Sequence, residues 1–502
     1  MKRRRPRAGR IAAFTLSLAP ATVLAAGDCA ALKLKTGATG NIEQRQDLRA
    51  GDFQPEGAAP LPDLPAFCRV VAVLKPAPGS AIRMEVWMPR EGWNGKFMGV
   101  GNGGFSGSIS YAALAEALKR GYATASTNTG HDGASGSFAL GQPQKLIDFG
   151  YRAVHEMTLA ARQLTSDFYA RPAARSYWNG CSAGGRQGLQ SAQRYPEDYD
   201  GIIAGAPAID WSGRASSALR VAQAVRAAPD AFLDAAALSL LYRGALSSCD
   251  ASDGLADEVI ESPQNCRFDP QVLQCQGEAR QGCLSAAQVQ AARAIYASPV
   301  NPSTGRPITG LFPGSEPVWS TWAGKAPFGT AVDHFRYIVF GDVNWKPEQF
   351  RFERDAVRAE TMDGNTVNAL NPDLSRYFRR GGKLLQYHGW SDPQISPGVS
   401  PQYYEAVAQH AGGAQHVSDA YRLFMVPGMA HCSGGNGASS FDMVSVLERW
   451  VEQGVAPGEV EAKRLRSGKV DRTRRLCAWP RAARYSGQGD PDSAASFNCV
   501  AP

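Results

Sequence analysis

The sequence has 502 residues, of which 44% are hydrophobic and 20% charged, and this composition is that of an ordinary soluble globular protein with a large core. Its formal net charge is +7, but residues 1–26 contain six Lys and Arg and no acidic residue, so the rest of the chain carries only about +1. A nearly neutral chain gives no electrostatic reason to expect a nucleic acid as a partner.

The N-terminus has the three-part layout of a secretory signal peptide. Basic residues at positions 2–10 precede an apolar run at 11–24, which is followed by Ala25-Ala26-Gly27. We therefore predict a signal peptide over 1–26, cleaved near Ala26, for either Sec or twin-arginine export. The residues before Cys29 do not form a lipoprotein box, and no later apolar run is long enough to span a bilayer. The sequence thus predicts an exported protein, periplasmic or secreted, without a membrane anchor.

Ten cysteines form an even set, and in an exported protein they predict disulfides. The sequence alone does not fix their pairing, and each cysteine could have a local partner. Local spacing favours three pairs, and the remaining four cysteines would then form two more. The three are Cys249–Cys266, Cys275–Cys283 and Cys477–Cys499, and the two left over are Cys29–Cys68 and Cys181–Cys432.

The first part of the chain alternates between strand and helix patterns, which favours an α/β domain with a mostly parallel sheet. Residues 29–89 are β-rich, and a later strand leads into the glycine-rich segment at 101–105. Strands are expected at 67–74, 82–88, 93–100, 122–126, 176–178 and 199–207, and helices at 111–120, 148–165 and 185–194.

This alternation stops at Trp211 and returns at about 381. Between these points lie Ala-rich helices at 216–242, four clustered cysteines and loops rich in Gly, Pro and Trp. After them the expected order is a strand at 382–389, a helix at 401–411, a strand at 421–426 and a helix at 441–452. We therefore predict one α/β catalytic domain, made of 27–210 and 381–502, that is interrupted by a lid domain at 211–380.

The segment Gly180-Cys181-Ser182-Ala183-Gly184 has the Gly-x-Ser-x-Gly pattern of a nucleophile elbow. In a glycine-rich chain this pattern is often only a turn. Here a predicted strand precedes it and a predicted helix follows it, and this context favours a catalytic serine.

A serine nucleophile needs a base, a group that orients the base, and donors for the oxyanion. His431 and Asp392 each follow a predicted strand, and the order Ser182, Asp392, His431 is that of α/β-hydrolases. His388 is a competing base, but it precedes Asp392 and breaks this order, while Asp392 alone could be a turn residue before a proline. The expected oxyanion donors are the backbone N–H of Ala183 and one from Gly103 or Gly104.

With these residues in place, the sequence resembles the tannase and feruloyl esterase family, in which the serine and the histidine are each flanked by a cysteine of one disulfide. Cys181-Ser182 and His431-Cys432 carry the resemblance, which covers nearly the whole chain after residue 26. Further matching segments are Trp93-Asn94-Gly95, Gly101-Asn102-Gly103-Gly104, 180–186, 195–201, Gly205-Ala206-Pro207, 388–392 and 427–432.

The resemblance implies an α/β-hydrolase fold with a large inserted lid, and an exported serine esterase that cleaves esters of aromatic acids such as gallate or ferulate. It implies no organic cofactor. The family also includes mono(2-hydroxyethyl) terephthalate hydrolases. We expect an acidic residue after the serine in those enzymes, and this chain has Ala183 there, which argues against that narrower assignment.

The lid segment contains an acidic stretch at 249–259 that alone could be a surface turn. Carboxylates at intervals of three and four around a glycine suit a hard cation with oxygen ligands. The stretch resembles the family's calcium loop, which implies a structural Ca²⁺ remote from the triad. The implied ligands are the side chains of Asp250, Asp253 and Asp257 and the carbonyls of Leu255 and Val259.

Lid aromatics are the expected walls of a substrate slot, with an arginine as a clamp for a carboxylate, although most aromatics in such a segment form its core. The candidates are Trp319, Trp322, Phe328, Phe335 and Arg336.

Three other functions stay open at this point. A non-catalytic polyphenol- or carbohydrate-binding protein is disfavoured by the intact Ser182, Asp392 and His431. A serine peptidase is disfavoured by the paired cysteines. A metal-dependent hydrolase would lose its chemistry on chelation before it lost thermal stability.

Overall fold

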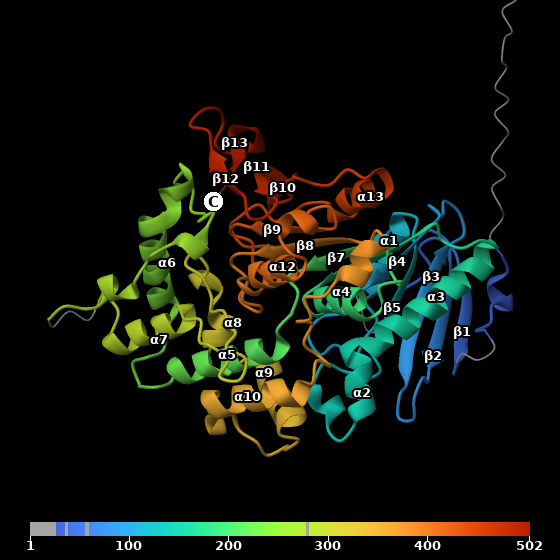
Figure 1. Cartoon of the computed structure of the whole chain (residues 1–502), viewed down its shortest axis with the longest axis horizontal. Helices are drawn as coiled ribbons and strands as arrows, with labels where there is room; N and C mark the ends of the chain where they lie inside the picture. The colour runs from blue at the N-terminus through green and yellow to red at the C-terminus, as the bar shows by residue number, and fades with distance from the viewer. Residues whose placement is uncertain (1–26, 36–38, 56–59, 278–280, 502) are drawn as a thin grey trace, which may run out of the picture.

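The chain is built around a nine-stranded mixed sheet (Figure 1). The computed structural model describes residues 27–35, 39–55, 60–277 and 281–501, so the predicted signal peptide lies outside the described residues. The strand order is β1-β2-β3-β5-β4-β6-β7-β8-β9. The strands from β5 to β9 are mutually parallel, whereas β1, β2, β3 and β5 pair antiparallel. The bounds are β1 (Gly40–Leu48), β2 (Phe67–Leu74), β3 (Ile82–Pro89), β4 (Lys96–Val100), β5 (Ala123–Thr127), β6 (Arg175–Cys181), β7 (Gly201–Gly205), β8 (Lys383–Gly389) and β9 (Tyr421–Val426).

The central strands are largely buried because helices cover both faces of the sheet. All residues of β5 and β7 are buried. The edge strand β1 is mostly exposed and carries Glu43, Arg45 and Asp47, a pattern that protects an edge from pairing with another chain. Its polar sequence is the reason why hydrophobic periodicity does not reveal it.

Helices cover both faces of the sheet (Figure 1), and a hydrophobic core lies on each face. Residues of α3, α4 and α12 contribute to the larger core, and residues of α1 and α13 to the other. The predicted helix at 148–165 begins as a π-helical turn over Asp148–Arg152 and continues as α3. The helices of this part are α1 (Tyr111–Lys119), α2 (Pro143–Ile147), α3 (Ala153–Tyr169), α4 (Ala183–Arg194), α11 (Ser375–Arg379), α12 (Val399–His410) and α13 (Met443–Gln453).

The connection between β7 and β8 holds a helical region with its own core of residues between Ala215 and Ala359, on the left and below in Figure 1. The Ala-rich helices expected at 216–242 are present as α5 and α6, which extend beyond those bounds at both ends. Asp234 caps α6 by accepting from the Ala237 N–H. The helices of this inserted region, for which we keep the name lid, are α5 (Trp211–Ala224), α6 (Ala235–Cys249), α7 (Ala286–Tyr296), α8 (Ser320–Ala323), α9 (Gly329–Asp333) and α10 (Phe352–Asp363).

All ten cysteines are paired in five disulfides. The pairs favoured from the sequence are confirmed, including the two left over after the local ones. They are Cys29–Cys68, Cys181–Cys432, Cys249–Cys266, Cys275–Cys283 and Cys477–Cys499.

Two short hairpins follow α13 and were not expected from the sequence. They lie beside α6 of the lid near the C-terminus (Figure 1). The strands β10 and β11 are rich in Lys and Arg, and the alternation of buried and exposed residues is clearest in the first half of β10, where Val460 and Ala462 are buried. The strands are β10 (Glu459–Arg466), β11 (Lys469–Cys477), β12 (Ala482–Tyr485) and β13 (Phe497–Val500).

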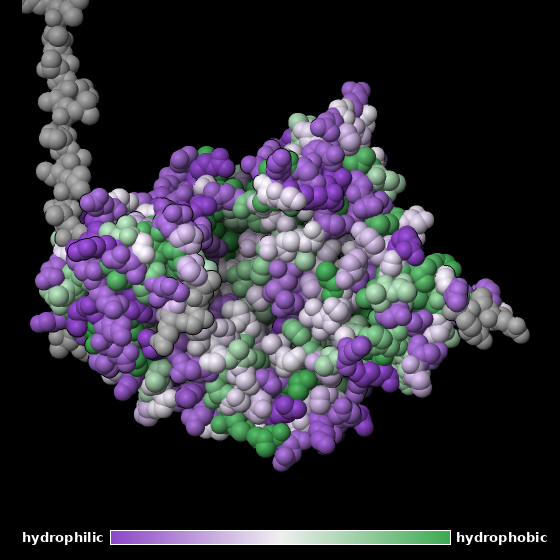
Figure 2. Space-filling model, turned by 180° about the vertical axis from the view of Figure 1, so that it is seen from behind, coloured by the Kyte–Doolittle hydropathy of each residue, from purple (hydrophilic) through white to green (hydrophobic). Residues whose placement is uncertain are grey.

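The surface seen from behind is hollowed, with hydrophobic residues in the depth and mainly hydrophilic residues around the rim (Figure 2). Among the described residues, no helix is both long enough and apolar enough to cross a bilayer.

Candidate active site

Ser182 occupies the sharp turn between β6 and α4. Its backbone angles, φ 63° and ψ −123°, belong to a strained conformation that is rare outside glycine. The turn is held on both sides, because the Ser182 N–H donates to the Gly205 carbonyl at 2.9 Å and the Ser182 carbonyl accepts from Arg186 and Ala208 at 3.1 and 3.2 Å. This strand-turn-helix geometry is the one that a nucleophile elbow requires.

Close backbone contacts require glycine at Gly180, in the Gly-x-Ser-x-Gly segment, and at Gly101, which packs against it. A Cβ at Gly180 would lie 2.5 Å from the Gly184 backbone, and a Cβ at Gly101 would lie 2.5 Å from the Gly184 Cα. Since any side chain there would collide with backbone, the pattern reflects packing as well as chemistry.

His431 and Asp392 follow β9 and β8, the two strands at the end of the parallel series. The His431 Nδ1 lies 2.7 Å from the Asp392 Oδ2. With its Nδ1 hydrogen donated to the carboxylate, the imidazole keeps Nε2 as an acceptor, which is the tautomer that a general base needs.

Asp392 is completely buried and accepts hydrogen bonds from four groups. The N–H groups of Gln394 and Ile395 donate to Oδ1 at 2.7 and 3.0 Å. His431 and His388 lie 2.7 and 3.2 Å from Oδ2. Burial alone would raise the pKa of Asp392, but the hydrogen bonds from the two histidines outweigh it and hold this pKa well below its usual range. The carboxyl is therefore ionised at every physiological pH.

His388, the competing base in the sequence, lies behind Asp392 and is completely buried. Its Nδ1 is 2.7 Å from the Ser400 hydroxyl, which in turn accepts from the Gln386 amide at 2.6 Å. Because that hydroxyl proton is then free to donate to Nδ1, the assignment that satisfies the network places the His388 hydrogen on Nε2, facing Asp392. His388 thus supports the carboxylate and has no access to substrate.

The Cys181–Cys432 disulfide connects the residue before Ser182 to the residue after His431. It joins positions 251 residues apart, with a Cα–Cα distance of 6.1 Å. The serine turn and the histidine loop are consequently fixed to one another across the inserted lid.

The predicted oxyanion loop lies against the first turn of α4. A Cβ at Gly184 would be 3.1 Å from both the Gly101 Cα and the Asn102 carbonyl oxygen. Gly104 has φ 52°, and nothing lies within 4 Å of the Cβ position of Gly103. The nearest atom to the Gly104 Cβ position is the Thr330 methyl at 3.9 Å, so α9 of the lid lies beside this loop.

The five lid residues expected at a substrate slot have different surroundings. Trp319, Trp322 and Phe335 are completely buried within the lid core, so their packing supports a structural role. Phe328 is half-buried beneath the Arg214 guanidinium, at 5.3 Å from its ring centre. Arg336 donates to the Trp345 carbonyl at 3.1 Å.

Arg214 was not singled out from the sequence, where it is one arginine in an Ala-rich helix. It is buried, stacks on Trp211 at 4.4 Å and donates to the Thr330 hydroxyl at 3.3 Å. Burial lowers the pKa of Arg214 to about 10, although the charges of Asp392 and Asp210 oppose this shift. Arg214 therefore stays charged, and it is a buried cation that the sequence did not reveal.

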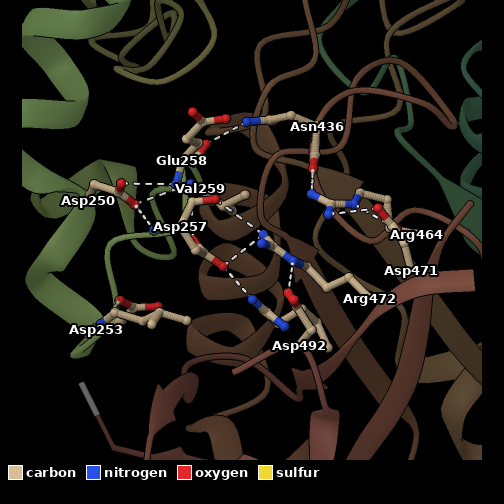
Figure 3. Close-up of polar contacts among 12 residues, drawn as sticks. Asp250, Asp253, Asp257, Glu258, Val259, Asn436, Arg464, Asp471, Arg472 and Asp492 are labelled. Atoms are coloured by element: carbon tan, nitrogen blue, oxygen red, sulfur yellow. Dashed lines mark hydrogen bonds and ion pairs between the residues drawn. The ribbon is translucent and has the colours of Figure 1, made fainter. Parts of the chain in front are cut away.

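The acidic loop at 250–259 lies between α6 and the C-terminal hairpins (Figure 3). The Asp250 carboxylate accepts the N–H groups of Asp257, Glu258 and Val259 at 3.3, 2.9 and 3.2 Å. Asp253 accepts from the Leu255 N–H at 3.1 Å.

Asp257, the third acidic residue of this loop, forms ion pairs with two arginines of strand β11. Its Oδ2 lies 2.9 Å from the Arg472 Nη1, and it also pairs with Arg474. These ion pairs were not expected from the sequence, because the two arginines follow the loop by more than 200 residues.

The chemistry of this loop fits a hard cation in part. Asp253 has no cationic partner within the described part of the chain, and burial, together with the charges of Asp257 and Asp250, raises its pKa to about 6. A half-buried carboxyl without a counter-charge is what an oxygen-ligand cation site offers. Asp257, by contrast, is held by arginines, and among the described residues no three acidic, His or Cys side chains converge on one point.

Comparison with known proteins agrees with these features. The model of the family described as tannase and feruloyl esterase matches residues 68–500. An uncharacterized esterase of Xanthomonas campestris is 38% identical, over 95% of this chain and 92% of its own length. A probable feruloyl esterase B-2 of Aspergillus fumigatus is 33% identical, over 86% of each chain.

Solved structures give the same result. The crystal structure of feruloyl esterase B from Aspergillus oryzae matches with a TM-score of 0.88 and 31% identity, over 93% of this chain and 98% of that one. A tannin acyl hydrolase from Aspergillus niger matches with a TM-score of 0.78 at 21% identity, over 94% of each chain, and this likeness bears on the fold alone. The predicted α/β-hydrolase fold is confirmed.

Proposed function

The chain belongs to the tannase and feruloyl esterase family and is a carboxylic ester hydrolase, and we propose that it cleaves esters of aromatic acids with Ser182, His431 and Asp392 as its catalytic triad. The observation that carries this proposal is the position of Asp392, whose four donors keep it ionised while it accepts from His431 at 2.7 Å.

In the proposed mechanism, Ser182 Oγ attacks the ester carbonyl while His431 Nε2 takes its proton. The tetrahedral oxyanion is stabilised by the backbone N–H of Ala183 and by one from the Gly103-Gly104 turn. The alkoxide then leaves with the proton from His431, and an acyl-enzyme remains on Ser182. Water, deprotonated by His431, releases the acid and restores the serine. Asp392 stays ionised throughout and stabilises the imidazolium.

The aromatic acyl group is the part of the proposal that rests on the lid and the relatives' names. Phe328 and the buried Arg214 lie next to Thr330, which borders the Gly104 turn. An aromatic ring with a buried cation beside it suits a phenolic or carboxylate-bearing ring. Two relatives are named feruloyl esterases, which favours a hydroxycinnamate ester over the terephthalate half-ester.

Export is proposed on two grounds. The N-terminal segment has signal-peptide layout, and the five disulfides suit an oxidising compartment. Fractionation of the producing cells, with an immunoblot of each fraction, tests this. Retention of an uncleaved chain in the cytoplasm would contradict it.

We also propose that the acidic loop binds a structural Ca²⁺, with Asp250, Asp253 and Asp257 and the carbonyls of Leu255 and Val259 as its ligands. The counter-charge missing at Asp253 supports this. The ion would neutralise the loop and take no part in ester chemistry. Calcium titration of chelator-treated protein in a calorimeter should therefore show binding that Asp253→Asn weakens, and unchanged heats in that variant would contradict the site.

The proposed activity is tested with methyl gallate, methyl ferulate and mono(2-hydroxyethyl) terephthalate. Wild type should hydrolyse at least one of them, and Ser182→Ala should lose this activity while keeping its thermal transition. Full activity in Ser182→Ala would refute the triad, and failure on all three esters would refute the substrate class.

A further inference from the structure

The loop that carries His431 has little regular structure of its own. Residues 427–437 close on themselves through a bridge between Met429 and Gly435 and through the Gly437 N–H, which donates to the Gly428 carbonyl at 3.2 Å. Positive φ at Gly428, Gly434 and Gly435 shows how far its backbone departs from extended structure. Such a glycine-rich loop needs anchors outside itself to keep a catalytic side chain in place.

Two anchors act at the tip of this loop, and they have been described. His431 donates to Asp392, and Cys432 is bonded to Cys181. Neither contact holds the end of the loop that leads toward α13. That end is held by the half-buried Asn436, whose contacts are drawn in Figure 3.

Asn436 uses both hydrogens of its amide on the lid. Its Nδ2 donates to the Glu258 carbonyl at 2.5 Å and to the Tyr242 hydroxyl at 2.8 Å. The Tyr242 hydroxyl itself donates to the Glu258 carbonyl at 3.1 Å. Burial raises the pKa of Tyr242 to about 12, with the charge of Glu258 adding to the shift, so this hydroxyl keeps its proton. The three groups form a closed triangle in which every donor has an acceptor.

The same residue also contacts the C-terminal hairpins. Its backbone carbonyl accepts from Arg464 at 3.2 Å, and Arg464 is held by Asp471 through two contacts of 2.9 Å. Asn436 therefore joins three parts of the chain, namely the acidic loop of the lid, the histidine loop and the β10–β11 hairpin (Figure 3).

The partner of Asn436 on the lid is itself fixed. Glu258 has φ 68°, an unusual value outside glycine, and its N–H donates to the Asp250 carboxylate at 2.9 Å. The direction of the Glu258 carbonyl thus depends on the fold of the acidic loop, and the hydrogen bond from Asn436 depends on that direction.

We propose that Asn436 is a positioning residue for His431, which transmits the conformation of the lid's acidic loop to the base of the histidine loop. This inference rests on the proposed triad. It predicts that loss of the amide hydrogens lowers the rate of the chemical step, because a small displacement of a catalytic group has a large effect on rate, while substrate binding is retained.

The test compares Asn436→Ala and Asn436→Asp with wild type on the ester that wild type hydrolyses fastest. Asp has the shape of Asn but donates no hydrogen bond when ionised, so it separates packing from donation. Rates are divided by the number of active sites, counted by fluorophosphonate labelling that is carried to completion, so that unfolded protein is left out and slower labelling does not lower the count. Asn344→Ala, at an exposed lid asparagine, is the matched control.

Both Asn436 variants should lose about tenfold in kcat per titrated site, with KM within about twofold of wild type. Tyr242→Phe should lose less, because the bond from Asn436 to the Glu258 carbonyl remains, and it also serves if Asn436→Ala does not fold. Asn344→Ala should match wild type.

A wild-type kcat per site in Asn436→Asp would overturn the inference, as would a defect confined to KM. Failure of the proposed function looks different, because Ser182→Ala would then keep its activity. An inactive Ser182→Ala beside a fully active Asn436→Asp removes only the role of Asn436.

Discussion

Two completely buried carboxyl groups, Asp392 in the catalytic domain and Glu316 in the lid, have opposite acidities. Glu316 accepts from the Tyr296 hydroxyl at 2.5 Å and from the Gly314 N–H at 2.9 Å. These neutral donors do not offset burial, which raises the pKa of Glu316 to about 7. Asp392 has two backbone donors and two histidines, and its pKa is lowered.

The difference lies in the donors, because burial opposes ionisation at both sites. Glu316 only accepts hydrogen bonds from neutral neighbours, and it can gain or lose a proton near neutral pH. In the proposed mechanism the Asp392 carboxylate stabilises an imidazolium and must stay ionised, and its four hydrogen-bond donors keep it so. We therefore expect substitutions of Asp392 and Glu316 to have different effects on activity and stability.

The largest effect is expected from removing the negative charge at the catalytic site. Asp392→Asn should lower kcat by about 10³- to 10⁴-fold, because the amide no longer favours the imidazolium or the required tautomer. Glu316→Gln, the matched change in the lid, should keep kcat within about threefold. Steady-state kinetics of both variants check this, and equal losses would show that the two carboxyls do not differ in role.

The next effect concerns the disulfides of the same two regions. Cys181–Cys432 closes a span of 251 residues and is worth up to about 5.5 kcal/mol in the chain-entropy model, against about 2.5 kcal/mol for Cys275–Cys283, whose span is 8 residues. Replacing the first pair by Ala should lower both the unfolding midpoint and kcat. Replacing the second should affect the midpoint less and spare kcat. Calorimetry and kinetics at a temperature where all variants are folded decide the matter, and an undiminished kcat without Cys181–Cys432 would speak against a positioning role.

A smaller effect is expected from His388. His388→Leu removes one of the four donors to Asp392, and since a hydrogen bond to a charged group is worth about 1.5–3 kcal/mol, kcat should fall by about tenfold or more. The wild-type rate in this variant, measured on correctly folded protein, would mean that the other three donors suffice.

The smallest effect is a pH dependence of stability from the lid. The pKa of Glu316 is raised from 4.5 to about 7, so the folded protein binds this proton more tightly than the unfolded chain does. The stabilisation is complete below about pH 4.5 and is lost as the pH rises through about 7. The unfolding midpoint of wild type should therefore fall more steeply between pH 5 and 8 than that of Glu316→Gln. Parallel curves would contradict the raised pKa.

Much of the catalytic domain was predictable because its strands and helices obey local rules. The strand at 421–426 and the helix that begins at Tyr111 were placed from apolar runs and flanking glycines, and the order of Ser182, Asp392 and His431 followed from position after strands. The disulfide pairing was also recovered, although the four cysteines left after the three local pairs still allow three arrangements.

The missed features depend on contacts between segments far apart in the chain. Nothing local distinguishes Arg214, Asn436 or Arg474 from surface residues, because their partners lie far away in the sequence. The burial of Trp319, Trp322 and Phe335 could likewise not be predicted, because the sequence does not distinguish an aromatic residue of a core from one that lines a pocket. The hairpins β10–β13 were overlooked because most of their residues are exposed or only partly buried, which leaves little hydrophobic pattern.

The proposed triad is tested most directly by fluorophosphonate labelling followed by peptide mass spectrometry. The reagent reacts only with a serine whose proton is taken by a neighbouring base, so the account predicts one adduct per chain, on Ser182, and none in the folded His431→Ala variant. Labelling of a different residue, or undiminished labelling of Ser182 without His431, would contradict the proposed chemistry.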